Sequence, residues 1–164
     1  MANFENDENV KSNQVLSRYK NNSVVFLRND SFFIAELDSR GKIVNAAYTN
    51  DFDRIQPEGQ FAYSEKSGEL YYVNGGKLFK AKQRKRGKWV NSAYIEVKGS
   101  EVKRDKYPGS VLAYANWRYL PKDSIVIVNP TINSQGDVLY FSSNMNNAKS
   151  RDIWEMAKGQ NGEW

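Results

Sequence analysis

Short hydrophobic runs alternate with polar turns along most of this chain. From Val24 onward, β-branched and aromatic residues gather in runs that Gly, Asn, Asp and Ser separate, and no segment there has a helical period. This spacing is typical of consecutive antiparallel strands. The pattern therefore predicts an all-β chain, with strands at 23–28, 31–37, 42–48, 60–65, 69–73, 77–82, 88–97, 110–119, 124–129, 137–143 and 151–157, and a stub at 163–164.

The first 22 residues differ from the rest. They are polar, and a thin apolar periodicity is present only at Val10, Val15 and Leu16. We predict a flexible polar lead or a short helix over 1–22, outside a repeat domain that spans 23–164.

Two distant segments have the same order of residue types. KLFKAKQRKRGKW (77–89) and RDIWEMAKGQNGEW (151–164) each contain paired large apolar residues, a polar stretch and then Gly-charge-Trp. The step from the aliphatic residue to the Trp is 11 residues in both, from Leu78 to Trp89 and from Ile153 to Trp164. Because the two Trp residues recur at equivalent positions, we expect them to pack between strands.

A weaker copy of this unit lies at 23–43, where SVVFL, FFIAEL and RGKI follow one another. In the two later copies a further strand precedes the hairpin, which makes four short strands per unit, as in a β-propeller blade. We therefore predict about three antiparallel propeller blades, at 23–59, at 60–124 with an insert at 98–124, and at 125–164. Three blades do not close a ring. A fragment, an assembly of chains or another β arrangement all stay open.

The last of these units resembles a known family. PTINSQGDVLYFSSNMNNAKSRDIWEMAKGQNGEW (130–164) is similar to a blade of the WD-repeat-like, TolB-type propellers, through Pro130, the Ser-x-Gly turn, Leu-Tyr-Phe, Asp-Ile-Trp and Gly-x-Trp. The order of the blades resembles the propeller portion of OmpA-family outer-membrane-associated proteins of Bacteroidetes type. This resemblance implies a binding or scaffolding module in the periplasm or at the outer membrane.

Composition removes several kinds of chemistry. The 164 residues include no Cys and no His, so thiolate or imidazole metal sites and Ser-His-Asp or Cys-His catalysis cannot be built. We expect no cofactor, no metal site and no catalytic residue. No apolar run approaches the roughly 20 residues that a membrane-spanning helix needs, so no transmembrane segment is predicted.

The net charge of +5 comes from one hairpin, since no acidic residue occurs between Leu70 and Ile95. Alternation along a strand would place Lys80, Lys82, Arg84 and Arg86 in one row, which could bind a polyanion. A charged strand edge that prevents edge-to-edge pairing explains the same row, and we favour it. Nucleic acid is not expected as a partner, because the nearby Phe79 and Trp89 are better explained as core.

Two aromatic residues lie in the insert, outside the repeats. Trp117 and Tyr119 in ANWRYL are candidate contacts with a ligand or partner, although burial in a core is favoured slightly. With the basic row, they complete the candidate binding residues.

Scattered carboxylates do not single out a catalytic pair. Asp51 and Asp53 lack the alternating oxygen ligands of a calcium loop, and no two acids are marked for glycoside hydrolysis. The first hypothesis is therefore a non-catalytic module that recognises a protein or a cell-envelope glycan through its loops, with self-association to complete the sheet left open. The alternatives are a propeller hydrolase that acts on glycans or peptides through carboxylates, and a polyanion binder that uses residues 77–88.

Overall fold

A computed structural model describes residues 14–84, 87–97, 126–145 and 151–164, and these residues form strands and turns without a helix. The N-terminal sheet contains β1 (Gln14–Tyr19), β2 (Ser23–Arg28), β3 (Ser31–Leu37) and β4 (Ile43–Tyr48). The middle sheet contains β5 (Ala62–Ser64), β6 (Glu69–Asn74), β7 (Lys77–Gln83) and β8 (Trp89–Tyr94). The C-terminal sheet contains β9 (Ile127–Ile132), β10 (Val138–Ser143) and β11 (Asp152–Ala157).

Each sheet is an antiparallel meander in which sequential strands are neighbours. The central hairpins of the first two sheets turn on two residues with positive φ, Asn29-Asp30 (48° and 58°) and Gly75-Gly76 (58° and 69°). Such turns match the right-handed twist of the strands that they join. The all-β prediction and the antiparallel hairpins are therefore confirmed within the described residues.

The three turns that follow the central hairpins have the same hydrogen bonds. In the N-terminal sheet, Asp38 N donates to Lys42 O, and Gly41 N donates to Asp38 O. The same pair of bonds recurs in the turns Arg84–Lys88 and Gly159–Glu163. In each turn the glycine has a φ near +80°, which favours a residue without a Cβ. The sequence repeat is thus a repeat of one structural unit.

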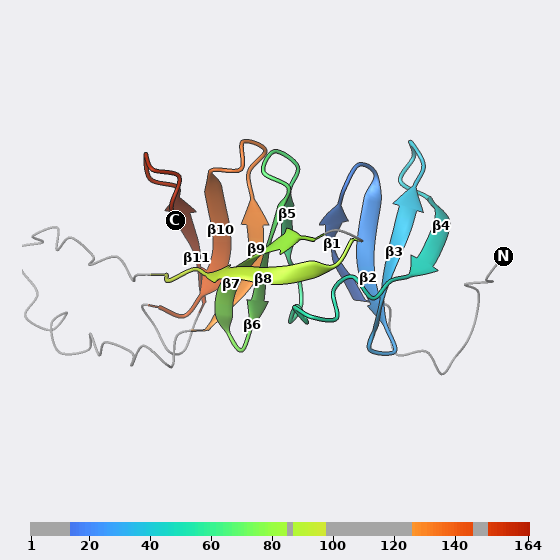
Figure 1. Cartoon of the computed structure of the whole chain (residues 1–164), viewed down its shortest axis with the longest axis horizontal. Helices are drawn as coiled ribbons and strands as arrows, with labels where there is room; N and C mark the ends of the chain where they lie inside the picture. The colour runs from blue at the N-terminus through green and yellow to red at the C-terminus, as the bar shows by residue number, and fades with distance from the viewer. Residues whose placement is uncertain (1–13, 85–86, 98–125, 146–150) are drawn as a thin grey trace, which may run out of the picture.

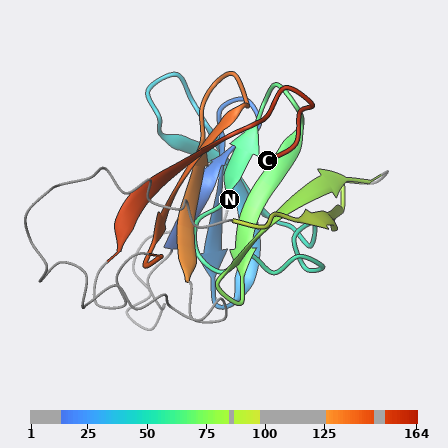
Figure 2. The same cartoon turned by 90° about the vertical axis from the view of Figure 1, so that its left-hand side faces the viewer.

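The three sheets lie face to face along the long axis of the molecule, with the middle sheet between the other two (Figure 1); seen from the end of the stack, they overlap (Figure 2). We call the side of each sheet that looks toward the C-terminal sheet its forward face, and the other its rear face. One core packs the forward face of the N-terminal sheet, with Val25 and Phe32, on the rear face of the middle sheet, with Leu70 and Tyr72.

The second core repeats this arrangement one sheet further along. It packs the forward face of the middle sheet, with Tyr71 and Leu78, on the rear face of the C-terminal sheet, with Leu139 and Phe141. β6 is consequently buried on both faces from Glu69 to Val73, as expected for a strand inside a stack.

Two expectations need correction. Residues 14–19 of the expected lead form β1, which pairs with β2, so the first unit starts earlier than residue 23. The stub at Glu163–Trp164 is not a strand.

The described residues form three stacked sheets, and no closed ring of blades is present among them. The strand expected at 110–119 and the insert at 98–124 lie outside the described residues. No helix in the described part of the chain is long and apolar enough to cross a membrane.

Candidate binding groove

The first strands of the three units lie side by side. β1 contacts β5, and β5 contacts β9. Between these strands is an open groove of about 390 Å³, to which each of the three sheets contributes side chains. Its lining residues are Ser17, Arg18, Tyr19, Asn21, Phe61, Ala62, Tyr63, Glu65, Pro130, Thr131 and Ile132.

Aromatic rings form one side of the groove. Tyr19 is buried, and its ring lies 5.2 Å from that of Tyr63, which is half-buried. Behind them, Trp89 Nε1 donates a hydrogen bond of 3.1 Å to the hydroxyl oxygen of Tyr19. Burial raises the pKa of both tyrosines, so each hydroxyl keeps its proton at neutral pH. Of these two rings, the half-buried Tyr63 is therefore the one that offers surface to the groove, while Tyr19 supports it from the core.

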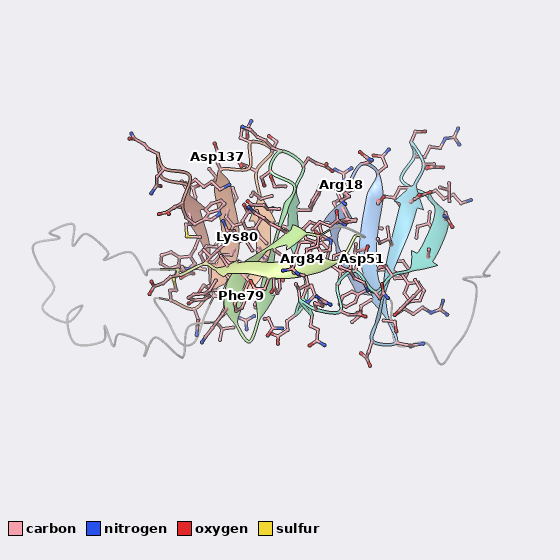
Figure 3. The ribbon with its side chains drawn as sticks, in the orientation of Figure 1. Arg18, Asp51, Phe79, Lys80, Arg84 and Asp137 are labelled. Carbon is pink, nitrogen blue, oxygen red and sulfur yellow. The ribbon has the colours of Figure 1, made fainter. Side chains whose placement is uncertain are left out.

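Polar groups at the rim come from the ends of β1 and β5. Arg18 and Glu65 are exposed and carry opposite charges, and Figure 3 shows the position of Arg18 over β1. Glu65 accepts a hydrogen bond of 3.0 Å from the backbone N of Asn21, and Ser17 Oγ donates to the carbonyl of Phe61. These bonds hold the N-terminal and middle sheets together at the groove and fix the position of its rim.

The structure shows only part of the row of basic side chains that the alternation of residues predicts for the basic hairpin. Lys80 and Lys82 lie on one face of β7, but both approach Glu69, with Nζ to Oε1 distances of 3.8 Å and 3.7 Å. Arg84 follows the end of β7 and is exposed; Figure 3 shows it toward Asp51, away from Lys80. Arg86 lies outside the described residues, as do Trp117 and Tyr119, so their binding roles stay predictions.

Glu69 is the centre of a charged cluster that the sequence does not reveal. It is nearly buried, and Tyr71 donates to its Oε2 at 2.9 Å. Burial alone would raise the pKa of Glu69, but this hydrogen bond and the charges of Lys80, Lys158 and Lys82 lower it below 4.5. Burial and the same hydrogen bond raise the pKa of Tyr71 strongly. The cluster keeps a nearly buried carboxylate ionised beside the second core.

Sequence reasoning did not select the groove residues. Arg18 falls in the stretch expected to be a lead, and Tyr63 was placed only in an ordinary strand. The signal available in the sequence was the further strand that precedes the hairpin in the two later units, which corresponds to β5 and β9. Among the described residues, no group of three His, Cys, Asp or Glu side chains could hold a metal ion.

The fold and the groove define an all-β protein of three stacked antiparallel sheets whose first strands share one concave surface. Comparisons with protein-family models, with curated proteins and with solved structures find no match to this chain.

Proposed function

We propose that this chain is a non-catalytic binding module of the β-propeller type, and that its partner lies in the groove along β1, β5 and β9. The observation that supports this proposal most directly is that all three sheets contribute to one groove. In a propeller the corresponding strands surround the central channel. The family resemblance at 130–164 agrees with this interpretation.

The chemistry of the groove suits a partner with both polar and apolar parts. Tyr63 offers a ring for packing, and Arg18 and Glu65 offer charge-assisted hydrogen bonds of either sign. A polypeptide or an oligosaccharide has this mixture of groups. A location in the periplasm or at the outer membrane is part of the proposal and rests on the family resemblance alone.

Hydrolysis of glycans or peptides is supported less well. A glycosidase needs two carboxylates about 5–10 Å apart across the scissile bond. Of the described side chains that line the groove, Glu65 is the single carboxylate, and it accepts a hydrogen bond from the Asn21 backbone. These observations favour recognition over bond cleavage.

Polyanion binding through residues 77–88 also has weaker support. Glu69 lies close to both Lys80 and Lys82, so it offsets part of the positive field that a phosphate or sulfate chain would require. Binding of this kind should weaken steeply as salt is added, which separates it experimentally from binding in the groove.

Chemical-shift mapping tests the proposal. Amide spectra of the ¹⁵N-labelled protein would be recorded with three probes: an N-acetylglucosamine oligosaccharide, a set of unstructured peptides and heparin. We expect the oligosaccharide or the peptides to shift amides of β1, β5 and β9. Shifts confined to β7 with heparin, lost at high salt, would contradict the proposal and support the polyanion alternative.

Variants of the groove make the test sharper. Arg18→Ala and Tyr63→Ala should each weaken binding by about fivefold or more, because each removes a contact inside the groove. Arg40→Ala is the matched control, since Arg40 is an exposed arginine in the turn after β3. Equal losses from Arg18→Ala and Arg40→Ala would mean that net charge, and not the groove, determines binding.

A further inference from the structure

Two hydrogen bonds set the register between the strands on either side of the groove. Ser17 Oγ donates to the carbonyl of Phe61, and the backbone N of Asn21 donates to Glu65 Oε1. Both bonds join residues that are 44 positions apart in the chain. The segments 17–21 and 61–65 therefore run side by side in the same direction, with one constant offset along the groove.

This register gives the order of three side chains along the groove. The rings of Tyr19 and Tyr63, with centroids 5.2 Å apart, lie between the two bonds. Arg18 precedes Tyr19 by one residue, and Glu65 follows Tyr63 by two. The groove therefore presents a cation, then an aromatic ring, then a carboxylate. Since three residues of extended chain span at most about 10 Å, the backbone positions of the two charged residues are offset by no more than that.

The two charges are available to a ligand. Arg18 is exposed, and its guanidinium has no hydrogen-bond or ion-pair partner among the described residues. Glu65 is exposed too, and within the same part of the chain only its Oε1 has a partner, the backbone N of Asn21. The opposite charges thus lie at one groove without pairing with each other. Each can form a charge-assisted hydrogen bond to a group of the complementary sign.

Neutral polar groups beside these charges are available as well. The side-chain amide of Asn21 and the hydroxyl of Thr131 are exposed, and neither has a hydrogen-bond partner among the residues that the structure describes. An amide and a hydroxyl both donate and accept. They therefore suit a polypeptide backbone, which offers one N–H and one C=O at each residue. The half-buried Ile132 adds apolar surface from the C-terminal sheet.

We propose that the groove along β1, β5 and β9 binds an extended polypeptide segment in which an apolar residue stands between an acidic and a basic residue. This inference rests on the proposed function and names the class of partner. The acidic side chain pairs with Arg18, the apolar side chain packs on Tyr63, and the basic side chain pairs with Glu65. Asn21 and Thr131 hydrogen-bond to the backbone of the segment.

The dimensions of an extended polypeptide agree with this arrangement. Residues i and i+2 of an extended chain lie on the same side, about 7 Å apart. Long acidic and basic side chains cover what remains of the offset between Arg18 and Glu65. Polypeptides also carry charges of both signs on neighbouring residues, whereas nucleic acids and the common acidic glycans carry one sign. A partner of those other classes leaves Arg18 or Glu65 without a complementary charge.

Short peptides are the probes, each with Ser-Gly-Ser on both sides of a central triplet. The triplets are Glu-Leu-Lys, the neutral Gln-Leu-Gln and the charge-altered Lys-Leu-Lys. Fluorescence anisotropy measures affinity for the whole chain, and amide shifts of the ¹⁵N-labelled protein locate the site. We expect Glu-Leu-Lys to shift amides of β1 and β5. It should bind about tenfold more tightly than Gln-Leu-Gln, because two exposed charge pairs contribute about threefold each.

Exchanging charges on the protein makes the test specific. Arg18→Glu should lower the affinity for Glu-Leu-Lys about tenfold and raise that for Lys-Leu-Lys by a similar factor, since attraction and repulsion change places. Glu65→Gln should weaken Glu-Leu-Lys about threefold, while its amide oxygen still accepts the bond from the Asn21 backbone. Arg40→Glu is the matched control, because it makes the same change of net charge at an exposed turn outside the groove lining. It should leave the preference among the peptides unchanged.

Failure of this inference differs from failure of the proposed function. If Glu-Leu-Lys and Gln-Leu-Gln bind in the groove equally well, or if Arg18→Glu does not exchange the preference, the charge pattern is overturned and the groove stays the binding site. The same holds if the N-acetylglucosamine oligosaccharide binds there more tightly than every peptide. Equal effects of Arg18→Glu and Arg40→Glu would also overturn the pattern. If neither the peptides nor the oligosaccharide shift groove amides, the proposed function itself fails, and this inference fails with it.

Discussion

The two interfaces between sheets share one geometry but differ in chemistry. Between the N-terminal and middle sheets the core is aromatic, with Tyr19, Phe52, Phe61 and Trp89 in contact through rings 5.4–6.2 Å apart. Between the middle and C-terminal sheets, aliphatic residues predominate beside Tyr71 and Phe141. Next to this core the nearly buried Glu69 accepts a hydrogen bond from Tyr71.

This difference shows which features of the unit are essential. Both interfaces have the same three features: the turn with its glycine, a forward face that packs on a rear face, and the large residue that follows the turn. The identity of the buried side chains varies. In the second interface the buried carboxylate of Glu69 has the Tyr71 hydroxyl and the surrounding lysines as its partners.

The largest expected effect comes from emptying the aromatic interface. Trp89 is fully buried, so Trp89→Ala should leave a cavity and lower the free energy of unfolding by about 3–5 kcal/mol. It also removes the donor to the Tyr19 hydroxyl. Urea unfolding followed by circular dichroism measures the change.

The matched control is the equivalent residue of the N-terminal sheet. Ile43 follows the same turn but is 49% exposed, because no sheet among the described residues covers the rear face there. Ile43→Ala should cost about 0.5 kcal/mol. Similar losses from the two variants would mean that the repeat position, and not burial between sheets, determines stability.

A smaller effect is expected from the charged interface. Glu69→Gln removes the ionised acceptor of the Tyr71 hydroxyl and the partner of two lysines, so it should destabilise by about 2 kcal/mol at neutral pH. Glu36→Gln, in the N-terminal sheet, is the control, since Glu36 is exposed. It should change stability by about 0.5 kcal/mol or less.

The pH dependence of this effect has a definite sign. The pKa of Glu69 is lower in the folded chain than its ordinary 4.5, so its ionisation favours folding above pH 4.5. That contribution should disappear as the pH falls through the lowered pKa. The difference between the wild type and Glu69→Gln should therefore shrink in acid, and a constant difference from pH 7 to pH 3 would contradict the proposed cause.

Sequence patterns predicted the local units well, because these depend on neighbouring residues. The bounds of β2 and β3 agree with those expected, and the related segments 77–89 and 151–164 contain the same turn. β1 was missed because Ser17 and Arg18 at an open groove interrupt the apolar alternation that marks a covered strand.

The candidate groove and the Glu69 cluster could not be predicted in the same way. Each depends on how separate sheets approach one another: Arg18, Tyr63 and Thr131 meet from three sheets, and Lys158 reaches the environment of Glu69 from the C-terminal sheet. Alternation along β7 predicts that Lys80 and Lys82 share one face of the strand. Only the pairing of β7 with β6 shows that Glu69 lies on the same face. Periodicity describes one strand and does not include its neighbours.

The smallest expected effect distinguishes the turn at the aromatic interface from the equivalent turn of the N-terminal sheet. Gly41 and Gly87 have φ values of 78° and 83°, so alanine at either position should cost about 1 kcal/mol for the left-handed backbone. A Cβ at residue 41 meets nothing within 4 Å, whereas at residue 87 it would lie 3.0 Å from Asp51 Oδ2. Gly87→Ala should therefore cost about 0.5 kcal/mol more than Gly41→Ala.

In an Asp51→Ala background that excess should vanish, because the carboxylate causes it. A double-mutant cycle measured by urea unfolding tests this. An excess that persists without Asp51 would assign the difference to the backbone of the turn and not to its contact with the carboxylate of Asp51.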